Sequence, residues 1–248
     1  MKLIAAAHSD QGRVRRENQD SYRCDAHAGL FLIADGMGGR AGGKRASEEA
    51  AGVIAADMAA TVQGDAHVDV GARLTAAIER ANARVWQLAQ DDAALHGMGT
   101  TVAMLFAEGT VAHLAHVGDS RVYRVRDGQI EALTRDHSYA AELEGQGVEI
   151  SDAKTRARYD SMLTRAVGAE ETVEVEIARH QISVGEVFLL CSDGVYGMVA
   201  DADLAALVSS GQRDLAATCA AIIQHANSAG GRDNATVILV GAEDGPPA

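Results

Sequence analysis

Residues 111–133 read Val111-Ala-His-Leu-Ala-His-Val-Gly118-Asp119-Ser-Arg121-Val-Tyr-Arg-Val-Arg-Asp127-Gly128-Gln-Ile-Glu-Ala-Leu133. Three β-like runs, 111–117, 121–126 and 129–133, follow one another here with short breaks between them. The Asp127-Gly128 break is a strong hairpin signal, because a two-residue turn between strands needs positive φ values that Asp and Gly accept. The stretch therefore predicts antiparallel strand pairing.

Further β-like runs lie on both sides of this stretch, at 3–7, 30–34, 101–107, 173–181, 186–191 and 235–240. In the run at 173–181, Val173, Val175 and Ile177 alternate with glutamates, which is typical of a half-buried strand.

Helical spacing of apolar residues indicates covering helices at 44–62, 71–91, 203–209 and 215–229. Strands that are grouped together and helices that come in pairs predict an α+β fold with stacked sheets. Two of the helices should bury one face each, made of Leu74, Ile78, Ala81, Val85 and Leu88 in the first and of Cys219, Ile222, Ile223 and Ala226 in the second.

The composition fits a single domain, since the 248 residues are 47% hydrophobic and no composition shift marks a linker. We expect this domain to span 1–241 and a short disordered tail to follow at 242–248, where Pro246 and Pro247 lie. Residues 136–165 are charged and poor in large apolar side chains. They are either a mobile insertion or an ordinary surface helix and loop.

A net charge of −13 argues against binding to nucleic acid or to an anionic membrane, which both need a basic face. The three cysteines are too few and too scattered for a disulfide framework or a zinc site, and they fit a reducing cytoplasm. The five apolar residues after Lys2 are too few for a signal peptide, and no run approaches a membrane span. We therefore expect a cytoplasmic protein. We also expect a monomer, since no heptad seam is sustained that would indicate a coiled-coil dimer.

Five aspartates mark the ends of chain segments. Asp35, Asp119 and Asp193 each follow an apolar run, while Asp20 and Asp233 lie in polar motifs. Any one of them is ordinary turn chemistry. A carboxylate at the end of a buried strand is costly unless something positive compensates it, and clustered acidic oxygens favour hard divalent metals.

Seven motifs in order make the chain similar to the protein phosphatase 2C (PPM) family of metal-dependent serine/threonine phosphatases, particularly its compact bacterial members. The resemblance runs from Gly12 to Val240 and implies a four-layer fold, two mostly antiparallel sheets flanked by helix pairs, with a flap at 136–165. The motifs are Gly12-Arg-Val-Arg-Arg-Glu-Asn-Gln-Asp20-Ser, Asp35-Gly-Met-Gly-Gly39, Gly99-Thr-Thr-Val102, Val117-Gly-Asp-Ser-Arg121, Leu163-Thr-Arg-Ala-Val-Gly168, Cys191-Ser-Asp-Gly194 and Gly231-Arg-Asp-Asn-Ala-Thr-Val237.

The resemblance implies two Mn²⁺ or Mg²⁺ ions. Asp35 would bridge both, the carbonyl of Gly36 would bind one, and Asp193 and Asp233 would complete the shell of the first ion. Asp119 would share a third, weaker ion with Asp193.

Two more residues of the first motif have implied roles. Asp20 would hold metal-bound water or contact the second ion, and Arg15 would grip the substrate phosphate, since a guanidinium binds two phosphate oxygens at once. In the same motif Gln19 replaces an acidic residue that is frequent in the family, which would weaken the second ion's site.

Other side chains near these motifs are expected outside the site. Met37 stands where eukaryotic members have a histidine proposed to protonate the leaving group, so the general acid is unassigned. Asn234 is expected to form a turn or support a ligand. His113 and His116 should lie on opposite faces of a strand and share no metal, and His137 is not assigned to the site.

The implied reaction is direct hydrolysis of phosphoserine or phosphothreonine in proteins by a metal-bridging water or hydroxide, without a covalent intermediate. Such an enzyme would counteract a bacterial serine/threonine kinase. One alternative is a phosphatase dedicated to an anti-sigma-factor antagonist type of partner, whose relatives usually carry sensor or membrane segments, and none is visible here. The other is a silent binding module, against which the intact Asp35, Asp193 and Asp233 argue.

Overall fold

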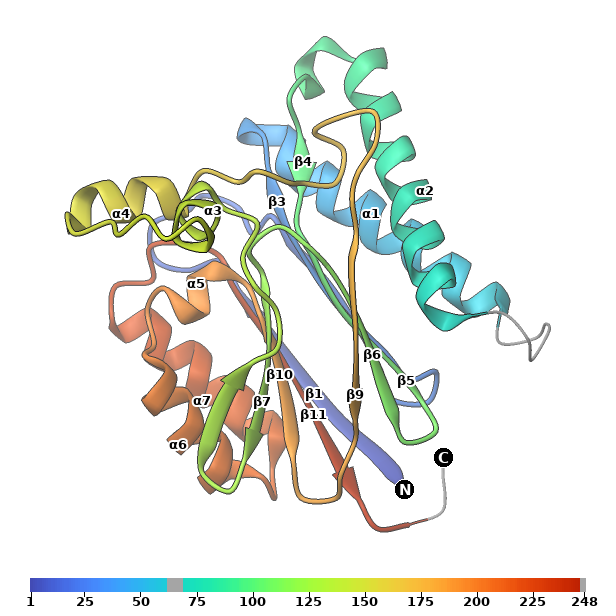
Figure 1. Cartoon of the computed structure of the whole chain (residues 1–248), viewed down its shortest axis with the longest axis vertical. Coiled ribbons are helices and arrows are strands. Elements are labelled where there is room, and N and C mark those ends of the chain that lie inside the picture. Colours follow the sequence, from blue (N-terminus) through green and yellow to red (C-terminus); the bar gives the residue numbers. More distant parts are fainter. Residues whose placement is uncertain (62–68, 246–248) are drawn as a thin grey trace.

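The computed structural model describes residues 1–61 and 69–245, and for 39–41 and 60–61 it describes the backbone alone. Two antiparallel sheets are stacked face to face, and a pair of helices covers the outer face of each (Figure 1). This arrangement confirms the predicted four-layer α+β fold. No helix in the described ranges is both long and apolar enough to cross a bilayer.

Each sheet is built from strands that are distant in the sequence. The first sheet has the order β1 (Lys2–Asp10), β11 (Ala235–Glu243), β10 (Val187–Cys191), β7 (Arg121–Arg126) and β8 (Gln129–Ala132). The second sheet has the order β2 (Asp20–Asp25), β3 (Leu30–Met37), β5 (Val102–Glu108), β6 (Val111–Val117) and β9 (Glu176–Gln181), and the short β4 (Gly99–Thr100) pairs with β3.

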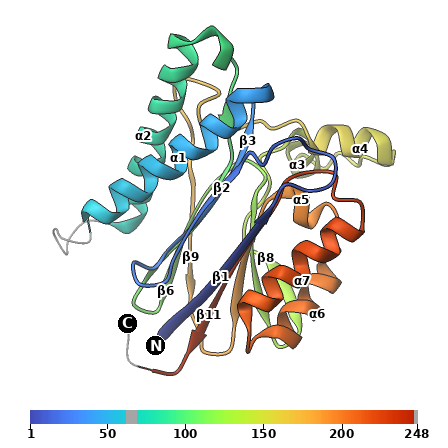
Figure 2. The same ribbon diagram turned by 180° about the vertical axis from the view of Figure 1, so that it is seen from behind.

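The helices form the two outer layers, as the view from behind in Figure 2 shows. Helices α1 (Gly39–Thr61) and α2 (Val70–Asp91) cover the second sheet, while α6 (Asp201–Gly211) and α7 (Leu215–Ser228) cover the first. A 3₁₀ turn, η1, spans Ala93–Leu95. The predicted faces are confirmed in α2, where only Leu88 is partly exposed, and in α7, where all four residues are buried.

Strand β3 shows how the layers are held together. Phe31 and Ile33 point into the core between the sheets, whereas Leu30 and Leu32 pack against the helices on the outer side. Burying each side chain of this size contributes about 1.5–3 kcal/mol, so the strand is fixed from both faces. The residues at its end, Asp35 and Gly36, therefore have a rigid support.

The hairpin prediction holds for one of the two breaks in residues 111–133. Strands β7 and β8 pair with Arg126 opposite Gln129, and Asp127 (φ 50°) and Gly128 (φ 75°) form the turn. Strands β6 and β7 instead belong to different sheets. The chain crosses from one sheet to the other at 118–120, which places Asp119 between them.

Several boundaries differ from the sequence predictions. Strand β2 was not predicted, because its sequence is polar and it lies at a sheet edge where one side needs no apolar cover. Strand β9 begins at Glu176 and not at 173, since its partner β6 stops pairing there. Strand β11 extends to Glu243, beyond the expected domain end at 241, and positions 246–248 of the expected tail lie outside the described residues.

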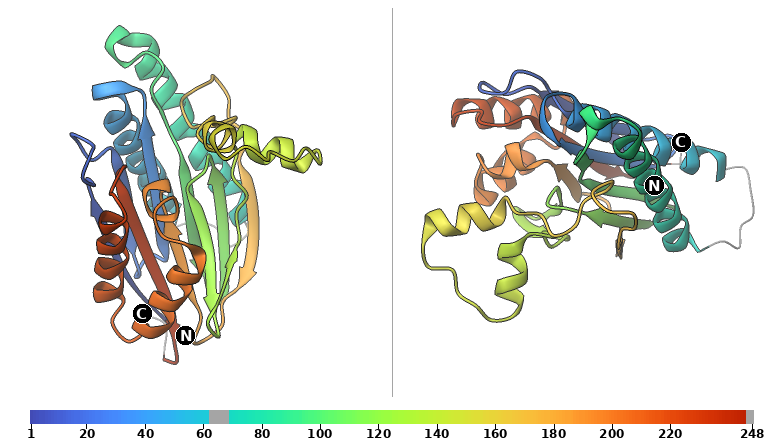
Figure 3. Two further views of the ribbon diagram at one scale, coloured as in Figure 1. Left: turned by 90° about the vertical axis from the view of Figure 1, so that its left-hand side faces the viewer. Right: turned by 90° about the horizontal axis from the view of Figure 1, so that it is seen from above.

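The segment 136–165 contains two short helices, α3 (Tyr139–Gly145) and α4 (Ala153–Asp160), and projects from one end of the sandwich (Figure 3). Ser138 and Asp152 cap these helices through their side chains. At the base of the segment, the backbone N–H of His137 donates to the carbonyl of Gly118 at 2.8 Å, and that of Thr164 donates to the carbonyl of His137 at 2.8 Å. The segment is thus fastened directly to the Asp119 crossover.

Candidate metal centre

The five aspartates meet at one end of the sandwich because the strands that carry them are antiparallel. Strands β3 and β10 end there, while β2 and β11 begin there, and Asp20 lies directly opposite Asp35 in the pairing of β2 with β3. Asp193 is the first residue of the short helix α5 (Asp193–Tyr196) that follows β10. We call Asp20, Asp35, Asp119, Asp193 and Asp233 together the carboxylate centre.

A cavity of about 540 Å³ opens at this centre. The described residues that line it include four of the five aspartates, whereas Asp20 is only 3% exposed and lies beside Asp35. Two arginines, Arg15 and Arg16, are the cations among the described lining residues. The predicted site residues on the cavity wall are Arg15, Asp35, Gly36, Asp119, Asp193 and Asp233.

Asp20 is held from one side only. Its Oδ2 accepts hydrogen bonds from Ser192 Oγ at 2.8 Å and from Thr236 Oγ1 at 2.5 Å. Its Oδ1 is buried and has no hydrogen-bond partner among the described residues. Burial raises the pKa of Asp20 to about 6, and the charge of Asp233 adds to the effect.

Asp35 and Asp193 are in the same electrostatic situation. Burial raises the pKa of Asp35 well above its ordinary value, and the charges of Asp20 and Asp193 raise it further. Burial and the charges of Asp119 and Asp233 raise the pKa of Asp193 to about 7. Asp193 Oδ1, like Asp20 Oδ1, is buried without a partner in the described part of the chain. The ionised carboxylates therefore repel one another, and the nearby charge of Arg15 offsets only part of that repulsion.

Asp119 lies beside one further carboxylate, Asp136, and beside the ring of Tyr196. Burial and the charge of Asp136 raise its pKa to about 6, and a hydrogen bond from Tyr196 acts in the opposite direction. Arg121 binds Asp136 through two hydrogen bonds of 2.9 and 2.7 Å, and its guanidinium lies 3.7 Å from the centroid of the Tyr196 ring. Arg121 thus holds both Asp136 and the ring whose hydroxyl reaches Asp119.

The backbone of Asp35 is fixed by two threonines. Its N–H donates to Thr101 Oγ1 at 3.0 Å, and its carbonyl accepts from Thr100 Oγ1 at 2.8 Å. The next residue, Gly36, approaches α1 so closely that an added Cβ would lie 2.0 Å from the carbonyl oxygen of Gly43. Only glycine fits there.

Arg15 and Asn234 have different tasks at the cavity mouth. Arg15 Nη2 donates to Asp233 Oδ2 at 2.5 Å while about half of the arginine side chain stays exposed, which leaves it accessible to a ligand. Asn234 Oδ1 accepts from the N–H of Gln19 at 2.9 Å, and its amide donates to the carbonyls of Gln11 and Glu17. Asn234 braces the loop that carries Arg15, in keeping with the supporting role expected of it.

Four hydroxyl side chains of the site received no role from the sequence. Their residues stand inside the quoted motifs, but only Ser192 is adjacent to a predicted ligand, so the sequence indicates no contact for them. Which aspartate each one binds, through its carboxylate or its backbone, depends on how the strands pair and how the two sheets face each other. The four are Thr100, Thr101, Ser192 and Thr236.

The donor set fits hard divalent ions. Carboxylate and carbonyl oxygens surround one cavity, and two carboxylate oxygens are buried without partners among the described residues, which is the environment that Mg²⁺ and Mn²⁺ prefer. A bound cation would remove the repulsion that raises the pKa values of the aspartates.

Comparisons with known proteins agree with this geometry. The family model described as "Protein phosphatase 2C" matches residues 6–230. The serine/threonine phosphatase Stp of Listeria innocua is 36% identical over 253 residues, which cover 96% of this chain and 95% of that protein.

Solved structures give the same result. The serine/threonine phosphatase of S. agalactiae aligns with a TM-score of 0.89 at 31% identity, covering 97% of this chain and 100% of that chain. The catalytic domain of the serine/threonine protein phosphatase PstP, solved in complex with two manganese ions, aligns with a TM-score of 0.84 at 32% identity, covering 98% and 99%.

Proposed function

The chain belongs to the protein phosphatase 2C family of metal-dependent serine/threonine phosphatases, and on that premise we propose that the carboxylate centre is its active site. The observation that supports this assignment most is the convergence of four aspartates and Arg15 around one cavity. A neutral binding surface would gain nothing from carboxylates that raise one another's pKa.

The proposed metal ligands divide between two Mn²⁺ or Mg²⁺ ions and a weaker third. Asp35 would bind both of the first two ions, the carbonyl of Gly36 would bind one of them, and Asp193 and Asp233 would complete the shell of the first. Asp119 would share the third ion with Asp193, and Asp20 would contact the second ion or hold its water. When bound, such ions act as Lewis acids and lower the pKa of a water molecule.

The other groups of the site bind and orient the phosphate. Arg15 stands at the mouth of the cavity, where its guanidinium can bind two phosphate oxygens while Asp233 keeps it in place. The hydrogen bond with Asp233 raises the pKa of Arg15, so the side chain stays cationic. Met37 lines the cavity wall at the position of the eukaryotic histidine. Its thioether has no proton to donate, so this residue cannot protonate the leaving group.

The flap at 136–165 contributes to substrate choice. Ser161 and Leu163 from this segment line the cavity, so a phosphoprotein bound there would contact them. The physiological substrates are phosphoserine and phosphothreonine proteins modified by a bacterial serine/threonine kinase, whose action this enzyme reverses.

Release of phosphate from a phosphothreonine peptide in Mn²⁺ tests the assignment. We expect EDTA to abolish turnover, and Asp35→Asn to lower it about a thousandfold or more, since even a single oxyanion donor is worth 10²–10³. Asp127→Asn is the matched control, because this aspartate lies in the exposed hairpin turn and asparagine accepts its positive φ. Wild-type turnover in a folded Asp35→Asn protein would refute the role of Asp35.

A further inference from the structure

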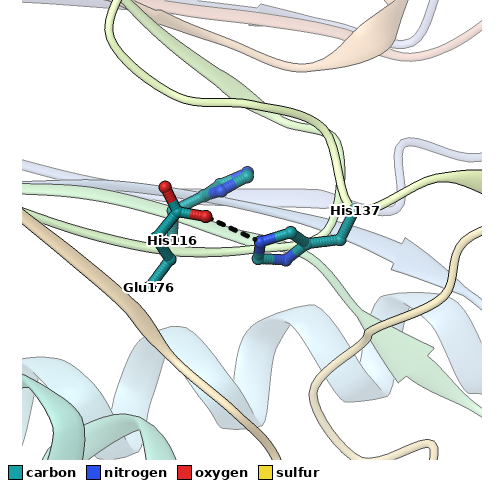
Figure 4. Close-up of side chains that lie close together, drawn as sticks. All are labelled: His116, His137 and Glu176. Atoms are coloured by element: carbon teal, nitrogen blue, oxygen red, sulfur yellow. Dashed lines mark hydrogen bonds and ion pairs between the residues drawn. The ribbon is translucent and has the colours of Figure 1, made fainter. Parts of the chain in front are cut away.

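A second group of metal-binding side chains lies outside the carboxylate centre. It consists of His116 near the end of β6, His137 at the base of the flap and Glu176 at the start of β9, and we call it the imidazole cluster (Figure 4). Each residue offers one ligand atom, and the three atoms lie within 4.8 Å of one another. The cavity of the carboxylate centre is lined by other residues.

Strand alternation and sheet register build this cluster. The expectation that His113 and His116 lie on opposite faces of β6 agrees with their contacts, because His113 approaches Glu108 at 3.6 Å whereas the ring of His116 lies 4.6 Å from that of His137. Glu176 is the residue opposite His116 in the pairing of β6 with β9. A histidine and a glutamate are thus cross-strand neighbours, and the flap base adds the second histidine.

His116 is buried with almost no polar partner. It is 1% exposed, and neither ring nitrogen forms a hydrogen bond of normal geometry within the described residues, a weak contact with the Ser120 backbone aside. Burial lowers the pKa of His116 to about 3, and the neighbouring His137 lowers it further, so the ring is neutral at physiological pH. A buried neutral imidazole whose ring nitrogens lack hydrogen-bond partners lowers the stability of the folded state.

His137 already points one nitrogen at the carboxylate. Its Nδ1 accepts a hydrogen bond from the N–H of Gly118 at 3.1 Å, so the ring proton is on Nε2, which lies 3.1 Å from Glu176 Oε2. That separation is close to the edge of a tetrahedron, about 3.3 Å, around an ion with ligand bonds of roughly 2.0 Å.

We propose that His116, His137 and Glu176 form a second metal site, which binds Zn²⁺ or a similar transition-metal ion in preference to Mn²⁺ or Mg²⁺. Two imidazoles and one carboxylate suit a borderline ion, whereas hard ions prefer sites made of oxygen alone. Three protein ligands with one position open to water is a frequent arrangement for zinc.

The ion has a way in and a tolerable electrostatic setting. A cavity of about 420 Å³ beside the cluster is lined by His137 and Glu176, and the Glu176 side chain is 48% exposed. Two arginines, Arg135 and Arg165, also line this cavity and oppose an incoming metal, but Arg165 pairs with Glu174 at 3.0 Å. Two further carboxylates, Asp136 and Glu142, line the same cavity, so the positive charge next to the site is partly offset.

Metal binding also changes the hydrogen bonding of the Asp119 crossover. The ion replaces the proton on His137 Nε2, the proton passes to Nδ1, and the ring stays neutral. The N–H of Gly118 then loses its acceptor, although the carbonyl of Gly118 keeps its bond from the His137 N–H. Because Gly118 precedes Asp119, occupation of the imidazole cluster should alter the backbone beside the carboxylate centre.

Equilibrium dialysis against Zn²⁺ tests the site directly, with saturating Mg²⁺ present to occupy the carboxylate centre. We expect one Zn²⁺ per wild-type chain and at least about tenfold weaker binding in Glu176→Gln. Glu142→Gln is the matched control, since Glu142 lines the same cavity outside the cluster and its loss removes the same charge. Equal zinc affinity in wild type and Glu176→Gln would overturn the proposal.

A second variant separates this site from the active site. Asp193→Asn disables the carboxylate centre and should retain the zinc, while loss of the zinc in that variant would assign the ion to the carboxylates and overturn the proposal. A shift of the Gly118 amide resonance on zinc addition, absent in Glu176→Gln, would support the predicted change in hydrogen bonding. None of these readouts depends on phosphatase turnover, so they stand even if the proposed active site is wrong.

Discussion

The carboxylate centre and the imidazole cluster lie on the two sides of the Gly118–Asp119 crossover. Asp119 belongs to the first, and the N–H of Gly118 binds a histidine of the second. Each group contains buried polar atoms without partners among the described residues, namely carboxylate oxygens in one and ring nitrogens in the other. A single crossover between sheets thus brings two different sets of candidate ligands close together, one made of oxygen ligands alone and one that combines two imidazoles with a carboxylate.

Burial acts on the two groups with opposite sign. It raises the pKa values of Asp20, Asp119 and Asp193, and it lowers those of His116 and His137. The cause is the same, since a buried site disfavours the charged form of an acid and of a base alike. A bound cation would favour the ionised carboxylates in the one group and use the neutral lone pairs in the other.

The largest expected difference between the two groups is in the effect of Asp193→Asn, which should impair the carboxylate centre and leave the imidazole cluster intact. Removal of one carboxylate that serves two of the proposed ions should lower Mn²⁺-dependent phosphate release about a thousandfold or more. The zinc content measured in Mg²⁺ should stay at one ion per chain. Phosphate release and zinc dialysis on the same preparation check both halves, and a variant that lost zinc while keeping turnover would invert the assignment of the two groups.

A smaller effect is expected from Arg15→Lys, because an ammonium cannot bind two phosphate oxygens in the fork geometry of a guanidinium. We expect KM for a phosphothreonine peptide to rise about tenfold, which corresponds to the loss of roughly one charge-assisted hydrogen bond. Steady-state kinetics checks this, with Arg13→Lys two residues earlier as the control. An unchanged KM in Arg15→Lys together with a raised KM in Arg13→Lys would move the phosphate contact to Arg13.

In metal-free protein, Asp193 and His116 should contribute to the pH dependence of stability with opposite signs. Between about pH 4 and 6.5 the folded state holds a proton on Asp193 that the unfolded chain has lost, so this group makes stability fall as pH rises. For His116 the unfolded chain holds the proton and the folded state does not, so this group makes stability rise.

Substitution of each residue isolates its contribution. Asp193→Asn should make the slope of unfolding free energy against pH more positive, and His116→Asn should make it more negative, each by at most about 1.4 kcal/mol per pH unit. Urea unfolding in EDTA at several pH values measures both slopes. Changes of the same sign in the two variants would contradict the electrostatic comparison.

The smallest effect should come from Tyr196→Phe, which removes the hydroxyl that reaches Asp119 and keeps the ring under Arg121. Loss of one hydrogen bond of about 1 kcal/mol should raise the Mn²⁺ concentration needed for half-maximal activity about fivefold. Tyr139→Phe, in an exposed aromatic pair of the flap, is the control. Identical Mn²⁺ activation curves for all three proteins would show that Tyr196 does not position Asp119.

The sequence by itself determined the local parts of this molecule. The Asp127-Gly128 hairpin, the buried faces of α2 and α7 and the position of an aspartate after each apolar run follow from turn chemistry and from the periods of strand and helix. These signals act between residues a few positions apart, so they can be read along the chain. The ordered motifs then indicated the family, whose fold and reaction class the comparisons confirm.

Only the tertiary structure decided which strands became neighbours. That β6 and β7 separate into different sheets, that the polar β2 lies at an edge, and that Glu176 stands opposite His116 depend on pairing between segments tens of residues apart. Such register is fixed by how whole layers bury their apolar faces, and a local window contains no record of it. For this reason the aspartates were visible in the sequence, whereas the hydroxyls that orient them and the imidazole cluster beside them were not.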